Sequence, residues 1–303
     1  AISLVTAFAT ATDRIKIATG ILPIFSRTPT VTAMSAVGVA EISGNRFVLG
    51  LGTGHRAIVE NIHGIPYSAP FDRMRETVNM IRGLLAGSSV SIEGKHFKVS
   101  GARLGRVAAS VSVPVYMAAL GPRMVGLAGQ IADGVLLNWT PADHIPENVD
   151  ILKCAAERAG RDPASVDSAG YIRTAITEGT SEEKIRHSLR EQVAGYASHP
   201  YYKRFFVSTG FSREMEESSK ALAAGDREAA VEAISLEMQD QIAVVGTAAA
   251  CRAEINRRRR LGLTLPVIAP FAVDEDIKGA YLRLIAAFGQ SRQKPSSSRK
   301  ECL

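Results

Sequence analysis

Short apolar runs alternate with helical patterns along most of this chain, and this alternation limits the possible folds more than any other feature. Six runs are rich in β-branched residues and bounded by glycine or polar residues, which is typical of strands. The predicted strands are Ile15–Ile21, Arg46–Gly52, Val113–Leu120, Gly134–Trp139, Ser168–Thr177 and Leu265–Ala272. The predicted helices are Thr28–Glu41, Ala69–Leu85, Arg123–Ile131, Pro146–Ala159, Ser181–Ala197, Thr247–Arg260 and Asp274–Phe288.

This order of elements predicts an α/β fold whose strands form a parallel sheet with right-handed crossovers. Such a sheet either closes as a (β/α)8-type TIM barrel or stays open, and six strands are two short of a closed barrel. We expect one domain over residues 1–290, with insertions near 90–100 and 196–240 that interrupt the pattern. The first insertion, Val90–Val99, has the pattern of a β-hairpin. Residues 291–303, with three consecutive serines and several basic residues, are predicted to be disordered.

The net charge of +6 is scattered except at Arg257–Arg260, at the end of a predicted helix. Cations there complement the carbonyl end of the helix dipole. Because aromatic residues do not interleave with the basic ones, we expect no nucleic acid partner and favour an anionic small molecule.

No segment is long and apolar enough to span a membrane. The first dozen residues are apolar without a preceding basic region, so they predict a core helix and not a signal peptide. The cysteines Cys154, Cys251 and Cys302 show no metal-ligand spacing. We therefore expect a reduced, cytoplasmic protein with neither disulfides nor a bound metal.

The stretch Arg46–Arg56 is the first candidate site, because a buried-strand pattern there runs directly into a turn with three glycines. Glycine lets the backbone approach a ligand or adopt positive φ. His55 and Arg56 follow at the carboxyl end of the strand, where α/β proteins bind ligands. The alternative is a glycine turn that serves tight packing only. The G-x-G-x-G spacing lacks the third glycine expected of a nicotinamide-binding Rossmann protein.

The stretch Val113–Arg123 repeats this arrangement, since a strand is followed by Gly121 and by Pro122 at the first turn of a helix. The free N–H groups and the positive dipole end of such a helix form a natural phosphate site, to which Arg123 adds charge. An ordinary strand-to-helix turn is the alternative interpretation.

The second insertion contains an aromatic segment with Tyr201, Tyr202, Phe205 and Phe206. Long insertions at the catalytic face of a barrel shape the access of substrate. The same four residues are also consistent with the inner face of a packing helix.

Five short motifs, in their joint order and spacing, resemble the luciferase-like monooxygenase superfamily over Ile2 to Phe288. The resemblance is strongest to the coenzyme F420-dependent oxidoreductase branch, which includes the methylenetetrahydromethanopterin reductases. The motifs are Thr12–Ile21, Ile42–Phe47, Gly50–Gly54, Ala118–Arg123 and Ala132–Gly134. Family members begin with two further strands, so the resemblance implies a luciferase-like (β/α)8-type barrel that lacks its first two strands.

The resemblance also implies roles for individual residues. Family members place a bulge, often with a non-prolyl cis peptide, at the position of Gly20–Ile21, behind the deazaflavin ring. His55 lies at the position of a polar active-site residue and is the expected catalytic group. The expected cofactor-binding residues are Gly20, Ile21, Gly52, Thr53, Gly54, Ala118, Ala119, Leu120, Gly121, Pro122 and Arg123. The expected substrate-contacting residues are Arg56, Trp139, Tyr201 and Tyr202.

The function implied is hydride transfer between coenzyme F420 and a small organic substrate that carries a carbonyl, an imine or an activated alkene. We expect the protein to form a homodimer. Two alternatives stay open at this point. One is a monooxygenase that uses reduced FMN, and the other is a catalytically silent truncated barrel.

Overall fold

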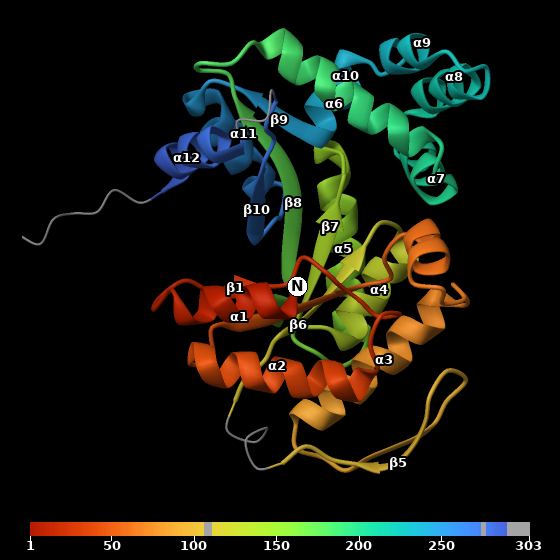
Figure 1. The fold of residues 1–303 in the computed structure, drawn as a ribbon, viewed down its shortest axis with the longest axis vertical. Helices are drawn as coiled ribbons and strands as arrows, with labels where there is room; N and C mark the ends of the chain where they lie inside the picture. Colours follow the sequence, from red (N-terminus) through yellow and green to blue (C-terminus); the bar gives the residue numbers. More distant parts are fainter. Residues whose placement is uncertain (106–110, 274–276, 290–303) are drawn as a thin grey trace, which may run out of the picture.

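The computed structural model describes residues 1–105, 111–273 and 277–289, and its central element is an eight-stranded parallel sheet (Figure 1). The strands of the sheet are β1 (Ile17–Ala18), β2 (Leu22–Pro23), β3 (Phe47–Gly52), β6 (Val115–Ala119), β7 (Gly134–Asn138), β8 (Asp167–Ile176), β9 (Ala243–Gly246) and β10 (Leu265–Pro270). Six of them follow the order β1-β3-β6-β7-β8-β10. In addition, β2 pairs with β3 and β9 pairs with β8. Within the described ranges β1 and β10 do not pair with each other, so the sheet is an open half-barrel of the predicted α/β type.

Helices follow most of the strands, as the sequence predicts. The helices are α1 (Ile2–Thr10), α2 (Pro29–Ser43), α3 (Pro70–Leu85), α4 (Pro122–Ile131), α5 (Ile145–Arg158), α6 (Glu182–Ala197), α7 (Pro200–Ser208), α8 (Ser212–Ala223), α9 (Arg227–Glu232), α10 (Leu236–Ile242), α11 (Ala248–Arg260) and α12 (Ile277–Phe288). Short π and 3-10 turns lie at Ile58–Ile62, Ala142–His144 and Pro163–Ser165. Side-chain caps explain several helix starts, because Thr28, Ser181 and Thr247 each accept a hydrogen bond from a backbone N–H of the first turn.

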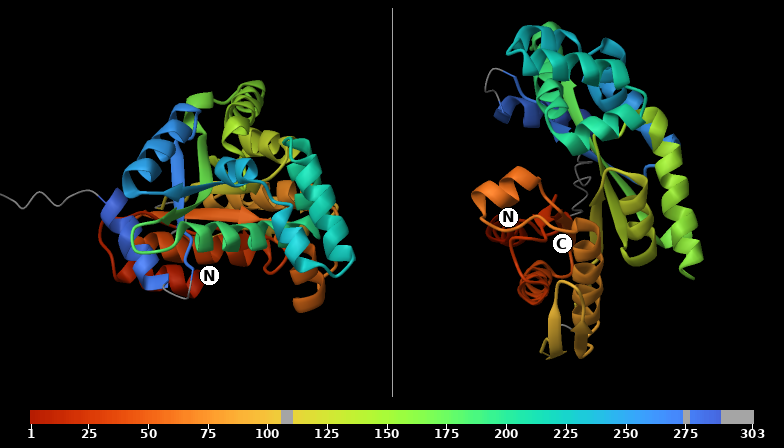
Figure 2. Two further views of the ribbon diagram at one scale, coloured as in Figure 1. Left: turned by 90° about the horizontal axis from the view of Figure 1, so that it is seen from above. Right: turned by 90° about the vertical axis from the view of Figure 1, so that its right-hand side faces the viewer.

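The two segments that we predicted as insertions form regular elements. The hairpin consists of β4 (Val90–Glu93) and β5 (Lys98–Ala102), and the second insertion folds into α7 to α10. Figures 1 and 2 agree that the hairpin and the α7–α10 group project from opposite ends of the molecule. The hairpin therefore lies far from the α7–α10 end. The predicted tail and Cys302 lie outside the described residues, and no helix in the described part combines the length and apolar character needed to cross a membrane.

Two strand predictions were wrong in detail. The predicted strand Ile15–Ile21 is split into β1 and β2, and the peptide bond Gly20–Ile21 between them is cis, as the family resemblance implies. Strand β9 was missed altogether. It has only four residues, and an apolar run of that length cannot be told from a buried helix segment by its periodicity.

Arg46 ties the N-terminal segment to the sheet. Its side chain donates hydrogen bonds to the backbone carbonyls of Ala9, Thr12 and Ile15 at 2.6–2.9 Å, so it fixes the chain between α1 and β1. The backbone reaches Arg46 through Gly44 and Asn45, both in the left-handed region at φ 61° and 64°. Glycine and asparagine tolerate this region best, which explains why they end α2 here.

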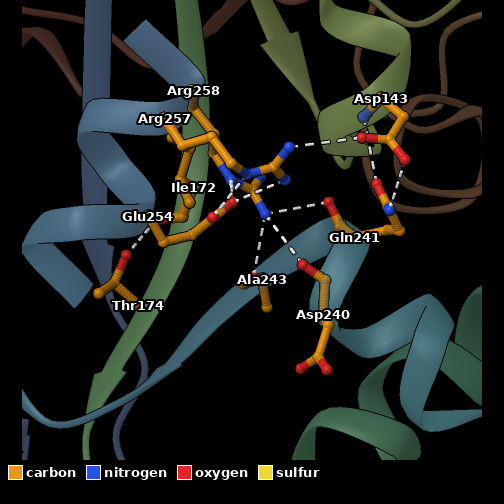
Figure 3. Close-up of polar contacts among 9 residues, drawn as sticks. All are labelled: Asp143, Ile172, Thr174, Asp240, Gln241, Ala243, Glu254, Arg257 and Arg258. Carbon is orange, nitrogen blue, oxygen red and sulfur yellow. Dashed lines mark hydrogen bonds and ion pairs between the residues drawn. The ribbon is translucent and has the colours of Figure 1, made fainter. Parts of the chain in front are cut away.

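Arg258 makes a similar connection between α11, α10 and β9 (Figure 3). The sequence predicted that the Arg257–Arg260 cations complement their own helix, and the structure corrects this at Arg258. Its Nη2 donates to the carbonyls of Asp240, Gln241 and Ala243 at 3.0–3.2 Å, and its Nε donates to Glu254 at 2.9 Å. The side chain is 1% exposed. It therefore satisfies the carbonyl end of α10 and holds it against β9.

The aromatic segment of the second insertion faces mainly inward. Tyr202, Phe205 and Phe206 are buried, whereas Tyr201 is 47% exposed. The three buried rings belong to a hydrophobic cluster that also contains Trp139 and residues of α6 and α10. This arrangement agrees with the packing-helix interpretation for Tyr202, Phe205 and Phe206.

Candidate functional site

The carboxyl ends of β3 and β6 meet the cis bond, and this contact brings three predicted cofactor-binding residues together. A Cβ built on Gly52 would lie 2.6 Å from the Ile21 side chain and 3.4 Å from the Cβ of Ala118. Only glycine at position 52 leaves room for Ile21 in this position. Gly54 follows at φ 69°, so the turn that leads to His55 also needs a residue that tolerates positive φ.

The start of α4 has no side-chain cap. Gly121 is the N-cap residue in an extended conformation without a side-chain cap, and Pro122 occupies the first turn. A Cβ built on Gly121 would meet no other atom within 4 Å. The guanidinium carbon of Arg123 lies 4.7 Å from the centre of the Phe71 ring, so Arg123 is held beside this helix start.

His55 lies in a cluster with three aromatic side chains from the α6–α7 region. Its ring centre is 5.5 Å from that of Tyr202, 6.0 Å from that of His199 and 6.2 Å from that of Tyr196. Burial, and then the charge of His199, lower the pKa of His55 below its ordinary value of 6.5. His55 is therefore neutral near pH 7 and can accept a proton at one ring nitrogen while donating from the other.

Arg173 of β8 joins this cluster from the sheet. Its guanidinium carbon lies 3.4 Å from the centre of the Trp139 ring, and its Nη1 donates to Oδ1 of Asn138 at 2.8 Å. The amide of Asn138 in turn donates to the Tyr202 hydroxyl at 3.2 Å. Burial raises the pKa of Tyr202 to about 12, so its hydroxyl stays protonated near neutral pH. A chain of contacts thus runs from Arg173 through Asn138 and Tyr202 to His55.

The structure brings some predicted substrate residues together and separates others. Tyr202 touches His55, and Trp139 is fully buried behind Arg173, with its ring edge against Tyr196. The guanidinium carbon of Arg56 instead lies 5.5 Å from the centre of the Tyr67 ring. The ring of Tyr201 contacts Arg204, whose guanidinium carbon lies 5.2 Å from the ring centre. Thr53 forms a side-chain hydrogen bond with Tyr67. The remaining predicted residues, Ala119 and Leu120, pack into the two hydrophobic clusters beneath this region.

Sequence reasoning missed four members of this site, Asn138, Arg173, Tyr196 and His199. Arg173 had a usable signal, because it is a cation in the middle of an apolar strand pattern, where charged side chains are rarely buried without a partner. The other three have no signal in the sequence alone.

In the described ranges, no group of three or more His, Cys, Asp or Glu side chains is arranged to hold a metal ion. A hollow of about 400 Å³ lies between α4 and α5 beside Cys154, and none of the predicted site residues lines it. The convergence of strand ends, and not this hollow, therefore marks the candidate active site.

A family model described as luciferase-like monooxygenase matches residues 1–265. The chain belongs to the luciferase-like monooxygenase family. This match confirms the resemblance that the sequence motifs indicate, and it makes the protein a member of an enzyme family.

Two relatives of this chain are named 5,10-methylenetetrahydromethanopterin reductases. The protein from Methanolobus tindarius is 33% identical over 267 residues, which cover 86% of this chain and 79% of the relative. The protein from Archaeoglobus fulgidus is 32% identical over 283 residues, which cover 91% of this chain and 82% of the relative.

A solved structure also resembles this chain closely. It is the coenzyme F420-dependent tetrahydromethanopterin reductase from Methanopyrus kandleri, with a TM-score of 0.76 and 27% identity. The match covers 94% of this chain and 85% of that structure. The chain therefore shares the fold of that structure over most of its length.

Proposed function

We propose that this protein is a coenzyme F420-dependent oxidoreductase that transfers hydride between the deazaflavin and a small organic substrate. The observation that carries the proposal is the contact of Ile21, Gly52 and Ala118 at the strand ends, next to the uncapped start of α4. The likeness to an F420-dependent reductase at a TM-score of 0.76 adds support.

The residues present fit this cofactor. The small residues Gly20, Gly52 and Ala118 lie around Ile21 and would hold the ring, together with the turn from Thr53 to Gly54. The segment Gly121–Arg123 would hold the phosphate, because its backbone N–H groups lack helical partners and the space at Gly121 is open. When bound, the deazaflavin supplies or accepts the hydride, and the protein contributes position and charge.

His55 is the proposed proton-transfer group. Its ring is neutral near pH 7 and keeps part of its surface accessible, so either ring nitrogen can exchange a proton with a substrate oxygen or nitrogen. The FMN alternative has weaker support. A solved FMN complex of a Baeyer-Villiger monooxygenase shares 19% identity with this chain and supports the fold alone.

Equilibrium titration tests the cofactor assignment. We expect coenzyme F420 to quench the protein fluorescence at lower concentrations than FMN or NADP do. Preference for NADP by about tenfold or more, which is 1.4 kcal/mol, would contradict the deazaflavin assignment.

The variant Gly121→Val tests the phosphate site. The extended backbone at φ −112° accepts valine, and its Cβ meets no protein atom, so the fold should survive while F420 binding weakens through exclusion of the phosphate. Arg123→Ala should weaken binding less, because the backbone already forms the site. Gly38→Val in α2 is the matched control, since its Cβ also meets open space and α2 contributes no residue to the proposed site. Equal F420 affinity in all three variants would exclude this location.

A further inference from the structure

Arg173 differs from the other described arginines whose pKa burial perturbs, because no carboxylate of the described residues faces it. Arg73 has Glu76 beside it, Arg161 has Asp133, and Arg186 has Glu182 and Asp240. Arg257 and Arg258 share Glu254. The groups that act on Arg173 in the described part of the chain are the tyrosines Tyr171, Tyr196 and Tyr202.

These neighbours position the Arg173 charge without neutralising it. The ring centres of Trp139 and Tyr171 lie 3.4 Å and 5.1 Å from the guanidinium carbon. Aromatic faces attract a cation but do not neutralise its charge. Burial raises the pKa of Tyr202 to about 12, so its hydroxyl adds no negative charge near pH 7. A partly buried cation of this kind is stabilised by an anion with matching geometry. Among the described residues, the cluster therefore lacks a negative charge that balances Arg173.

A ligand can reach this charge. Arg173, Tyr171 and Tyr196 are all part-exposed, and no nitrogen of Arg173 is fully buried without a hydrogen-bond partner. The guanidinium of Arg173 presents five N–H donors in a planar fork, and the hydrogen bonds to Asn138 and Tyr196 use two of them. Donors therefore remain for a second, planar acceptor such as a carboxylate, which this fork binds in a bidentate manner.

We propose that Arg173 is the receptor for a carboxylate group of the substrate. The substrate class is then a small carboxylic acid that carries a carbonyl, imine or activated alkene. The assignment of this substrate class rests on the proposed function, whereas the binding of an anion at Arg173 does not. His55 lies at the other end of the Asn138–Tyr202 contacts. An acid bound at Arg173 would therefore extend its reacting group toward His55.

The anion at this site has a second possible source, the phosphate of the cofactor. The proposal commits to the substrate because the predicted phosphate segment Gly121–Arg123 follows β6, whereas Arg173 lies within β8, and β7 separates the two strands. The experiment below distinguishes the two sources.

The chain has one tryptophan, Trp139, and the guanidinium of Arg173 lies on its ring, so tryptophan fluorescence reports directly on this site. The cofactor-free protein is titrated with cyclohexanecarboxylate and with the neutral cyclohexanecarboxamide, neither of which carries an aromatic ring. We expect saturable binding of the carboxylate about tenfold or more tighter than that of the amide, because the amide has no charge to pair. Equal response to both compounds, or to neither, would overturn the proposal.

Three variants locate the effect. Arg173→Met should weaken carboxylate binding about tenfold or more, and Arg173→Lys should weaken it less, because lysine keeps the charge without the fork. Arg204→Met is the matched control, since Arg204 is an exposed cation stacked on Tyr201, and its carboxylate affinity should equal that of the wild type. If Arg173→Met does not fold by circular dichroism, the lysine variant decides. Wild-type affinity in Arg173→Lys would then refute the bidentate site.

F420 titration of the same variants separates the two anion sources. Unchanged F420 affinity in Arg173→Met supports a substrate carboxylate, whereas a tenfold loss would assign the anion to the cofactor and overturn the substrate class. Wild-type protein that binds the carboxylate and not F420 would reject the proposed function while leaving this site in place.

Discussion

Replacing Arg258 by methionine removes the side chain that joins α10, β9 and α11. Methionine fills a similar apolar volume but has no N–H donors. Three backbone carbonyls lose the donor that Arg258 supplies, and the Glu254 carboxylate loses one of its two arginine partners. The position is 1% exposed, so little water can replace the lost donors.

The magnitude follows from these contacts. An unsatisfied buried acceptor costs about 1–3 kcal/mol, and removing one member of a buried ion pair costs about 3–5 kcal/mol in all. Because Arg257 still donates to Glu254 at 2.8 Å, the carboxylate keeps one partner. We therefore expect Arg258→Met to lower the free energy of unfolding by about 3–5 kcal/mol. The exposed Arg259 provides the control, and Arg259→Met should stay within about 0.5 kcal/mol of wild type.

Urea denaturation followed by circular dichroism measures both variants. The slope of unfolding free energy against urea should be the same for wild type and variants, so that the midpoints report stability alone. A loss below about 1 kcal/mol in Arg258→Met would refute the reasoning, because it would mean that water or a local shift satisfies the three carbonyls.

Further predictions concern the proposed active site. His55→Ala should lower turnover about 100-fold or more with little loss of F420 affinity, and an unchanged turnover would exclude proton transfer by His55. In an NMR titration the pKa of His55 should lie below 6.5, and His199→Gln should raise it. Because the folded state favours the neutral ring, the contribution of His55 should lower the free energy of unfolding only as the pH falls below 6.5. Gly52→Ala should displace the Ile21 side chain and weaken F420 binding, whereas Gly50→Ala, whose Cβ would lie 2.0 Å from a backbone oxygen, should destabilise the fold itself. Equal unfolding midpoints for these two variants would contradict this distinction.

Local patterns were sufficient to predict most of the helices and the strands that end in the candidate site. The turn after Gly52 and the start of α4 at Pro122 are each set by nearby residues, through positive φ at Gly54 and a proline in the first turn. Each of these features can be recognised from one short segment of the chain.

The parts that could not be predicted depend on distant contacts. Arg173 meets Trp139, and His55 meets His199, across 34 and 144 positions of the chain, and nothing in either segment indicates its partner. Similarly, the break between β1 and β2 is not indicated by local residues, and the resemblance to a family was needed to expect it at Gly20–Ile21. The fold was therefore easier to predict than the composition of the site.

The outer strand β10 also determines how the open half-barrel behaves in a crowded solution. An unpaired parallel strand offers a row of donors and acceptors on which a second molecule can add a strand and begin a fibre. Pro266 and Pro270 interrupt β10, and neither residue has a backbone N–H to offer. A neighbouring chain would find gaps in the hydrogen-bonding row, which makes strand addition unfavourable. We therefore expect these two prolines to disfavour self-association along this edge of the described sheet.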